Sequence, residues 1–121
     1  MHRDIKPNNL VIDPETMNLK IIDWGHAHFY ELNKEYSMHV GTGAYKGPEL
    51  LLKYNYYDYS VDIWAAGCVF SAMLFKKAAF FQRDPEVKYD FVGLLEFMSE
   101  ILGTQGLIDY IDKYDLSLKT N

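Results

Sequence analysis

Short apolar segments and turn-forming residues alternate over the first part of the chain. Residues 10–12 and 19–22 are apolar and partly β-branched, and the residues between them include Pro-Glu-Thr-Met-Asn at 14–18, which favours a turn. This pattern predicts a small β-hairpin. Residues 23–47 follow no dominant period and hold four of the eight glycines. We expect a long loop there, and loops of this length inside a compact domain are usually functional.

The centre of the chain predicts two helices. Pro48 suits the first turn of a short helix over 48–54. Ser60 suits the N-cap of a longer helix over 61–75, with Asp62 at the positive end of its dipole. That segment is apolar all round, which is typical of a helix buried on all sides.

Two further helices are expected toward the C-terminus. Apolar side chains recur at helical spacing over 91–102, and Gly103 ends this helix. Thr104 is the expected cap of the last helix, whereas residues 82–89 are expected to form an exposed loop. The order of elements predicts a mainly α fold with one small β-hairpin, as a single domain over residues 1–121.

Composition narrows the class of protein. Seventeen acidic against twelve basic residues give a net charge of −5, which argues against a nucleic-acid partner. The single Cys68 cannot form an internal disulfide, so a reducing compartment, cytoplasmic or nuclear, fits best. The longest apolar run, over 63–75, is too short to span a bilayer, and we expect no membrane association.

Four polar residues near the N-terminus suggest chemistry. Asp4, Lys6 and Asn9 lie in one short loop just before the predicted hairpin, and the hairpin can fold Asp23 back beside Asn9. Their amide and carboxylate oxygens suit Mg²⁺, which takes few protein ligands plus phosphate and water. Asp4 would be available to accept a proton, and Lys6 would carry positive charge toward a phosphate. This layout is typical of phosphoryl transfer.

Each of these residues also has an ordinary structural interpretation. Asp4 alone would be a solvated loop carboxylate, and Asn9 and Asp23 alone would be turn residues. Val11 and Ile22 are apolar strand residues that we expect to be buried in any fold. The loop histidines His26, His28 and His39 lack metal-ligand spacing and are expected at the surface. Cys68 is expected to pack in the core. The tyrosines of 54–59 are expected to pack or to line a rim.

Four motifs, in this order, resemble the protein-kinase signature. His-Arg-Asp-Ile-Lys-Pro-Asn-Asn at 2–9 resembles the catalytic loop. Asp-Trp-Gly at 23–25 resembles the metal-binding triplet, with Trp in place of the usual Phe. Gly-Pro-Glu at 47–49 resembles the end of the activation segment. The start of the central helix of the C-terminal lobe is matched by Asp62, Trp64 and Gly67.

Finer features are similar to the catalytic (alpha) subunit family of casein kinase II. They are Trp24, the Gly-Pro-Glu at 47–49, Leu-Gly-Thr at 102–104 and Asp-Tyr-Ile-Asp-Lys-Tyr at 109–114. The resemblance covers nearly the whole chain. It implies a partial protein-kinase C-terminal lobe and an ATP- and Mg²⁺-dependent transfer of phosphate to Ser/Thr hydroxyls of protein substrates.

The resemblance implies a role for each residue of the site. Asp4 matches the catalytic base, and Lys6 matches the residue that stabilises the transferred phosphoryl group and is typical of serine/threonine kinases. Asn9 and Asp23 match the Mg²⁺ ligands. Val11 and Ile22 match positions that line the adenine pocket.

Other matched positions concern the activation segment. Arg3 would hold that segment in place, and Asp62 would bond the backbone of the catalytic loop. Thr42 would face the protein substrate, with His39 and Lys46 near it. Casein kinase II-type enzymes select acidic substrates with basic residues at positions where this chain has His39, Gly43 and Lys46. Because only Lys46 keeps a permanent charge, we expect a weakened acidic preference.

Parts of a kinase have no match in these residues. A Gly-rich loop and a strand lysine normally precede the catalytic loop, so we expect a fragment that is inactive on its own. The helices that would pair Glu49 with an Arg and cover 61–75 are also unmatched, which predicts exposed apolar surface. The alternatives are a non-catalytic binding or regulatory kinase-lobe module, or a truncated gene model. The family's regulatory subunit docks mainly on an N-terminal lobe, outside the matched region.

Overall fold

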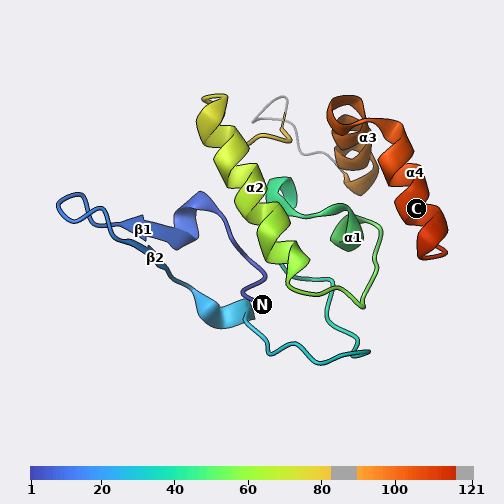
Figure 1. The fold of residues 1–121 in the computed structure, drawn as a ribbon, viewed down its shortest axis with the longest axis horizontal. Helices are drawn as coiled ribbons and strands as arrows, with labels where there is room; N and C mark the ends of the chain where they lie inside the picture. The colour runs from blue at the N-terminus through green and yellow to red at the C-terminus, as the bar shows by residue number, and fades with distance from the viewer. Residues whose placement is uncertain (83–89, 117–121) are drawn as a thin grey trace.

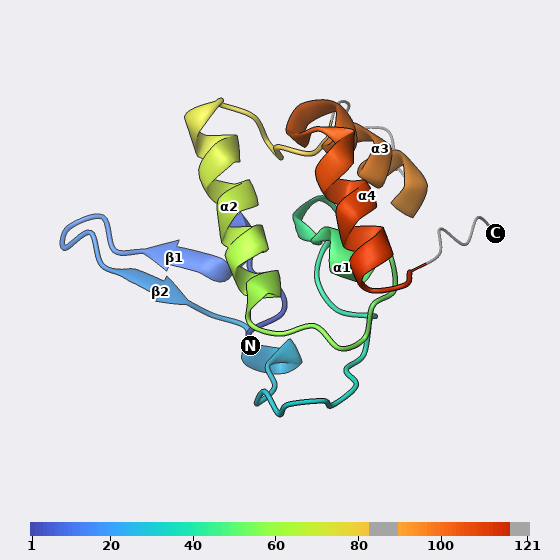
Figure 2. The same cartoon turned by 45° about the vertical axis from the view of Figure 1, so that its right-hand side comes forward.

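The computed structural model describes residues 1–82 and 90–116 (Figure 1). A hairpin lies at one side, the longest helix crosses the middle, and two shorter helices lie at the far side (Figures 1 and 2). The arrangement is mostly helical with one antiparallel hairpin. The elements are β1 (Leu10–Ile12), β2 (Leu19–Ile21), α1 (Pro48–Leu51), α2 (Ser60–Leu74), α3 (Phe91–Leu102) and α4 (Thr104–Lys113).

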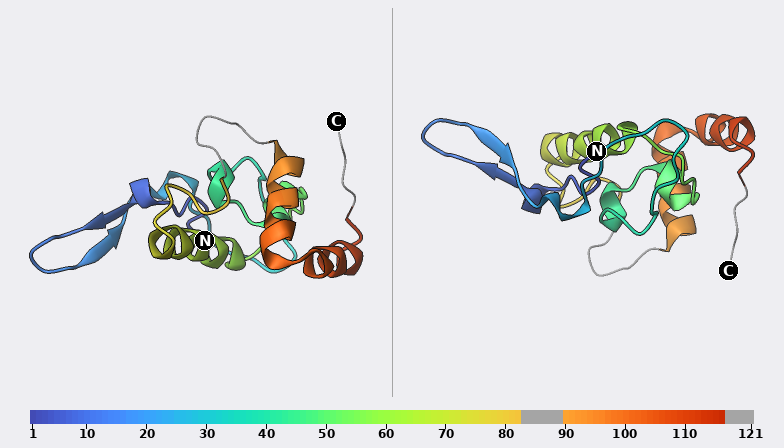
Figure 3. Two further views of the ribbon diagram at one scale, coloured as in Figure 1. Left: turned by 90° about the horizontal axis from the view of Figure 1, so that it is seen from above. Right: turned by 90° about the horizontal axis from the view of Figure 1, so that it is seen from below.

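The predicted hairpin is confirmed. β1 and β2 are antiparallel, and the pairs Leu10–Ile21 and Ile12–Leu19 fix the register. Seen from above, the hairpin extends away from the helices (Figure 3). The expectation that Val11 and Ile22 would be buried is wrong, because they are 47% and 43% exposed. No described element covers this part of the hairpin, so its apolar side chains stay accessible.

A long irregular segment joins the hairpin to the helices, as predicted. Its regular structure is limited to two 3₁₀ turns, at Trp24–His26 and Gly43–Tyr45. The segment then enters α1, which ends at Leu51 and is shorter than the predicted 48–54. One hydrophobic core joins α1 to α2 and α3. Its buried members are Leu51, Leu52, Cys68, Phe81, Leu94, Leu95 and Met98.

Helix α2 has two apolar faces with different environments. One face is buried, and its members are Val61, Ala65, Cys68, Val69 and Ala72. The other face, which we call the open face of α2, is exposed and contains Ile63, Phe70, Met73 and Leu74. The prediction of a helix buried on all sides is therefore wrong for this structure, whereas the expected exposed apolar surface is present. Cys68 is packed in the core as predicted, and burial raises its pKa to about 12.

The predicted cap of α2 is also wrong. Ser60 is the first helical residue and makes no side-chain cap. Its backbone N–H instead donates to the Asp58 carboxylate at 2.7 Å. An acidic side chain two residues earlier therefore supplies the acceptor that Ser60 was expected to supply.

Helices α3 and α4 form the far side of the molecule. α3 has the predicted bounds, and Asp90 caps it by accepting from the N–H of Gly93 at 2.8 Å. Gly103 ends α3 with φ +93°, a conformation that favours glycine. Thr104 begins α4 without the expected side-chain cap. The predicted loop over 82–89 lies, except for Gln82, outside the described residues.

Candidate active site

The backbone of the N-terminal loop is anchored to the start of α2. The N–H groups of His2 and Arg3 donate to the two carboxylate oxygens of Asp62, at 2.6 and 2.7 Å. Hydrogen bonds to an ionised acceptor are among the stronger ones in proteins. The contact expected for Asp62 is therefore present. These two hydrogen bonds fix residues 2–4 relative to α2, the longest described helix.

His2 connects this loop to the end of the hairpin. Its buried ring lies 3.0 Å (Nε2) from the carbonyl oxygen of Ile22, and its Nδ1 accepts from the N–H of Asp4 at 3.3 Å. These contacts assign the ring hydrogen to Nε2. The ring also packs edge-on against Trp24, with centroids 5.0 Å apart. The side chain of His2 thus holds residue 4 near residues 22–24.

Asp4, Lys6 and Thr42 form a closed triangle of polar contacts. The Lys6 ammonium lies 2.7 Å from Oδ2 of Asp4, and the Thr42 hydroxyl donates to Oδ1 of Asp4 at 2.9 Å. Lys6 also donates to the Thr42 hydroxyl at 3.1 Å. Thr42 lies 38 residues after Asp4 in the chain. The triangle therefore joins the N-terminal loop to the long irregular segment.

Asn9 supports the same carboxylate from the other side. Its Nδ2 donates to the Asp4 carbonyl at 2.8 Å and to Oδ2 of Asp4 at 3.2 Å. Burial of Asp4 pushes its pKa upward, but hydrogen bonds from Lys6, Thr42 and Asn9 and the Lys6 charge outweigh it. The net result is a pKa below the ordinary value for an aspartate. Asp4 is therefore an ionised, largely buried carboxylate near neutral pH.

Asn9 and Asp23 are brought together by the hairpin. The N–H of Ile22 donates to the Asn9 carbonyl at 2.9 Å, which places residue 23 next to the end of the N-terminal loop. In the described contacts the side chain of Asn9 uses only its amide nitrogen, so the side-chain oxygen remains available to a cation. Asp23 is exposed and has φ +62°. Two hard oxygen ligands on adjacent segments fit Mg²⁺.

Gly25 makes room for the Asp23 carboxylate. A Cβ at residue 25 would lie 3.3 Å from Oδ1 of Asp23, which is closer than most such contacts in proteins. A side chain at this position would therefore press on the carboxylate. The Asp-Trp-Gly triplet thus combines an exposed carboxylate with a small residue that leaves room for it.

Arg3 connects the N-terminal loop to the irregular segment. Its Nε donates to the His26 carbonyl at 2.6 Å, and its Nη1 donates to the Tyr57 hydroxyl at 3.2 Å. Tyr57 in turn donates to the Ser37 carbonyl at 2.5 Å. Arg3 therefore holds this segment at two points, as the resemblance implied. It does so with φ +69°, in the left-handed region.

Tyr57 is the residue of this region that the sequence did not identify. The tyrosines of 54–59 were expected to pack or to line a rim, and Tyr57 is indeed buried. Its hydroxyl contacts, however, reach residues 54 and 20 positions away in the chain. No local pattern predicts such distant partners. The available signal was only a tyrosine placed shortly before an apolar helix with an acidic residue, Asp62, in its first turn.

The remaining predicted site residues lie outside the polar cluster. Val11 and Ile22 are exposed on the hairpin, and the register places them on one face of it. His39 is exposed, as are His26 and His28, which agrees with the expected surface positions. Lys46 is half-buried, with its ammonium 5.4 Å from the centre of the Phe91 ring.

Two charged side chains near α1 are partly dehydrated. Burial lowers the pKa of Lys46, with the Asp4 charge opposing that shift. Burial raises the pKa of Glu49, which is 7% exposed and has no ion-pair partner among the described residues. The Glu49 carboxylate lies over Gly47, where a Cβ would be 2.5 Å from its Oε2. Glycine is therefore required at residue 47 while Glu49 keeps this position.

Comparison with known families identifies the class of protein. The family model of the protein kinase domain matches residues 1–112, which include the polar triangle, the hairpin and α2. The chain therefore belongs to the protein kinase family, whose members are phosphotransferases. Within the described residues, no helix has both the length and the apolar character needed to cross a bilayer.

Proposed function

We propose that this chain is the C-terminal-lobe part of an ATP- and Mg²⁺-dependent protein serine/threonine kinase of the casein kinase II alpha type. The observation that carries the proposal is the triangle of Asp4, Lys6 and Thr42. It holds an ionised carboxylate and a cation within a few ångströms of each other. Phosphoryl transfer relies on such positioning and charge neutralisation, with little covalent chemistry by the protein.

Asp4 acts on the acceptor hydroxyl of the substrate. Its lowered pKa keeps it ionised, so it would orient the hydroxyl and receive its proton as the hydroxyl oxygen bonds to the terminal phosphorus of ATP and the bond from that phosphorus to ADP breaks. Lys6 contacts both Asp4 and Thr42, and its ammonium would neutralise charge that develops on the transferred group. Thr42 keeps both side chains in place through a single hydroxyl.

The nucleotide and metal would bind beside this triangle. Asn9 and Asp23 would hold Mg²⁺, and Val11 and Ile22 on the shared face of the hairpin would contact the adenine. The bound metal would supply positive charge to neutralise the phosphates. The donor set supports this assignment, because the Asn9 amide oxygen and the exposed Asp23 carboxylate are both available oxygens.

The substrate side of the site carries a reduced positive charge. Thr42 faces the substrate in this proposal, with His39 and Lys46 as the basic neighbours. Lys46 is half-buried, with its ammonium 5.4 Å from the centre of the Phe91 ring, so part of its charge is already engaged. We therefore propose that serine or threonine peptides are accepted with a weak preference for acidic neighbours. The proposed compartment is cytoplasmic or nuclear.

The test is phosphate transfer from ATP to peptides that contain Ser, Thr or Tyr, with and without Mg²⁺. The chain is assayed alone and joined behind a casein kinase II-type N-terminal lobe that supplies the Gly-rich loop and strand lysine. We expect transfer to Ser and Thr only in the joined form. Asp4→Ala should reduce kcat roughly a hundredfold or more, the usual range for a general base.

Several results would contradict the proposal. Transfer that is unchanged in Asp4→Ala would remove Asp4 as the base, and transfer to Tyr peptides would remove the serine/threonine assignment. Activity of the chain alone would show that no further lobe is needed. An Asp4→Asn variant keeps the shape of the side chain and separates loss of the base from loss of folding. Equal melting temperatures for the two variants and the parent complete the control.

A non-catalytic binding role is the second candidate. The open face of α2 and the uncovered hairpin favour it, because contiguous exposed apolar side chains mark association surfaces. In that role the chain would bind a kinase or its substrates without turnover. A stable complex that persists in Asp4→Ala and is lost when Phe70 and Met73 are changed to Ser would support this candidate over catalysis.

A further inference from the structure

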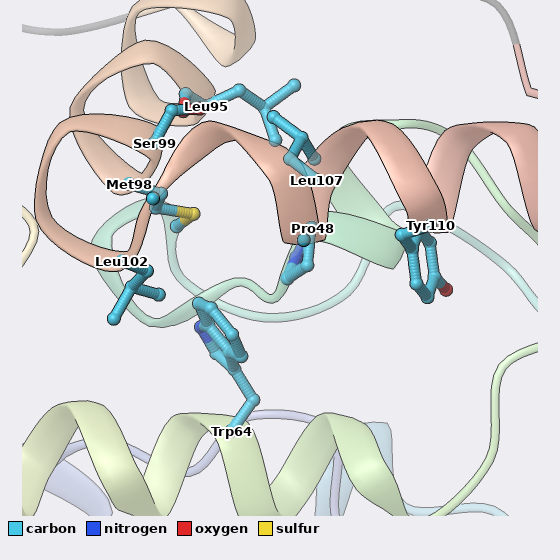
Figure 4. Close-up of a pocket in the computed structure, with 10 residues that line it drawn as sticks. Pro48, Trp64, Leu95, Met98, Ser99, Leu102, Leu107 and Tyr110 are labelled. Atoms are coloured by element: carbon cyan, nitrogen blue, oxygen red, sulfur yellow. The ribbon is translucent and has the colours of Figure 1, made fainter.

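A cavity lies between α2 and the α3–α4 pair, away from the polar triangle. Its volume is about 200 Å³, and Pro48, at the start of α1, also contributes to its wall. Figure 4 shows the indole of Trp64 projecting from α2 toward α3 and α4, with Leu102 and Tyr110 on either side. The wall is mostly carbon. Its other members are Leu95, Met98, Ser99, Gly103, Gly106 and Leu107.

One buried polar atom of this wall has no partner. Among the described residues, Nε1 of Trp64 is the buried side-chain nitrogen for which no hydrogen-bond acceptor is present. A buried donor without an acceptor carries a desolvation penalty that native proteins usually avoid. Phe81 stacks on the indole, with centroids 5.7 Å apart, so that ring is fixed by packing. The nitrogen lies on the Leu102 side of the ring (Figure 4).

Water alone is a poor partner for this N–H. A buried water needs two or more polar contacts, and most of the wall cannot provide them. The Ser99 hydroxyl hydrogen is committed to the Leu95 carbonyl at 2.8 Å, so this side chain offers a water an acceptor but no donor. A cavity of about 150 Å³ with an apolar wall is enough to accept a benzene-sized molecule. This cavity is larger, so it has room for one ring and a short substituent.

The charges nearby decide what kind of acceptor fits. Burial raises the pKa of Tyr110, and the carboxylate of Glu49 raises it further, so the Tyr110 side of the cavity lies in a negative field. Glu49 directly follows Pro48 of the wall. A ligand with a carboxylate would be repelled, whereas a neutral carbonyl would meet no such repulsion.

We propose that this cavity is a binding site for a small, neutral, mainly aromatic or aliphatic molecule with a single carbonyl-type acceptor, which accepts a hydrogen bond from Nε1 of Trp64. The site is independent of the proposed phosphate transfer, because none of the residues of the polar triangle contributes to its wall. Binding would satisfy the indole N–H of Trp64 and fill the carbon-lined space. No change in the catalytic residues is required.

Three probes of nearly equal shape test the proposal on the full 121-residue chain. Acetophenone carries the neutral carbonyl, α-methylstyrene replaces that carbonyl by a hydrocarbon group, and benzoate carries a negative charge. We expect acetophenone to bind roughly fivefold more tightly than α-methylstyrene, which is the effect of one neutral hydrogen bond. Benzoate should bind most weakly. Affinities are measured by NMR titration.

The indole N–H signals give a direct readout of the hydrogen bond. The chain has two tryptophans, and Trp24→Phe identifies the signal of Trp64 by leaving it in place. Acetophenone should move the Trp64 N–H resonance to lower field, and α-methylstyrene should not. Trp24 is 61% exposed and already donates to the Ile21 carbonyl, so it serves as the matched control.

The variants make the proposal falsifiable. Trp64→Phe should keep an apolar ring but remove the preference for acetophenone over α-methylstyrene, whereas Trp24→Phe should leave that preference unchanged. Equal binding of the two probes to the parent chain, no shift of the Trp64 signal, or tighter binding of benzoate would each overturn the proposal. If Trp64→Phe does not fold, the probe series on the parent chain still decides the question.

Discussion

The polar triangle and the α2–α4 cavity are two partly enclosed regions with opposite chemistry. Around the triangle, both oxygens of Asp4 and both oxygens of Asp62 accept hydrogen bonds. In the cavity the wall is mostly carbon, and the indole N–H of Trp64 is unpaired. The first region is therefore fixed by directional bonds to named atoms. The second is fixed by packing, which tolerates different occupants.

This difference predicts different responses to mutation. Removing an acceptor in the polar region leaves its donors buried without partners. The free energy of unfolding then falls by the full desolvation penalty of those donors. Removing carbon from a packed region costs transfer free energy plus a cavity term. Removing carbon from an exposed surface costs little. The following substitutions separate these cases, starting from the largest expected effect.

Asp62→Ala should be the most destabilising change. It removes two hydrogen bonds to an ionised acceptor and leaves the N–H groups of His2 and Arg3 unpaired. With about 1.5–3 kcal/mol for each such bond, we expect a loss of about 3 kcal/mol or more in the free energy of unfolding. Urea unfolding followed by circular dichroism measures it. Asp62→Asn keeps one acceptor and should lose less; equal losses would argue against two separate bonds.

Leu51→Ala and Leu74→Ala compare a buried with an exposed position of the same residue type. Leu51 is 3% exposed in the core, and Leu74 is 64% exposed on the open face of α2. We expect a loss of about 2–4 kcal/mol for Leu51→Ala and of less than about 0.5 kcal/mol for Leu74→Ala. Urea unfolding of both variants is the measurement. A similar loss for the two would show that the open face of α2 is covered in solution, for example by a second copy.

Tyr57→Phe tests the contact between Arg3 and the irregular segment. It keeps the buried ring but removes the hydroxyl that accepts from Arg3 and donates to the Ser37 carbonyl. We expect a loss of about 1–2 kcal/mol and faster hydrogen exchange over residues 26–40. Tyr56→Phe removes an exposed hydroxyl that contacts Glu35 and is the matched control. If exchange rises equally in both variants, Tyr57 has no special positioning role.

Glu49→Gln should have the smallest effect, and its size should depend on pH. Burial raises the pKa of Glu49, so the folded state holds the proton more tightly than the unfolded state, whose value is about 4.5. Stability contributed by this group therefore falls as pH rises above that value. We expect the variant to be more stable than the parent at pH 7 and equal to it at pH 3. Thermal melts at both values check this.

The exposed Glu96→Gln on α3 is the control for this pH dependence. It should not change the melting temperature relative to the parent at either pH. A Glu49→Gln variant that is less stable than the parent at pH 7 would mean that the carboxylate has a cation partner. Such a result would contradict the unpaired position found for Glu49.

Local patterns predicted the elements that local residues determine. The hairpin follows from two β-branched segments with a turn between them, and the end of α3 follows from Gly103, whose φ of +93° suits glycine. The caps of α2 and α4 were not predicted correctly. At α2 the Asp58 carboxylate accepts from the N–H of Ser60. Residue types alone do not show which of two neighbouring side chains, Asp58 or Ser60, caps the helix.

Long-range contacts account for the other differences. The contact of Asp62 with the catalytic loop was expected only because the motifs resemble a kinase, since 60 residues separate it from His2. The role of Tyr57 was missed, because its hydroxyl partners lie in two other segments. The burial of Val11 and Ile22 was mispredicted, because an apolar side chain in a strand indicates a preference for burial and not the presence of a covering element.

Arg3 and Asp23 both occupy the left-handed backbone region, with φ of +69° and +62°. For residues with a Cβ this conformation costs roughly 1 kcal/mol or more, which glycine would not incur. Backbone strain therefore favours glycine at these two positions, whereas side-chain chemistry favours arginine and aspartate. A library selected only for resistance to proteolysis should drift to glycine there, whereas one selected for phosphate transfer should retain the guanidinium and the carboxylate. The two selections therefore separate the energetic cost of these backbone angles from the proposed use of the side chains.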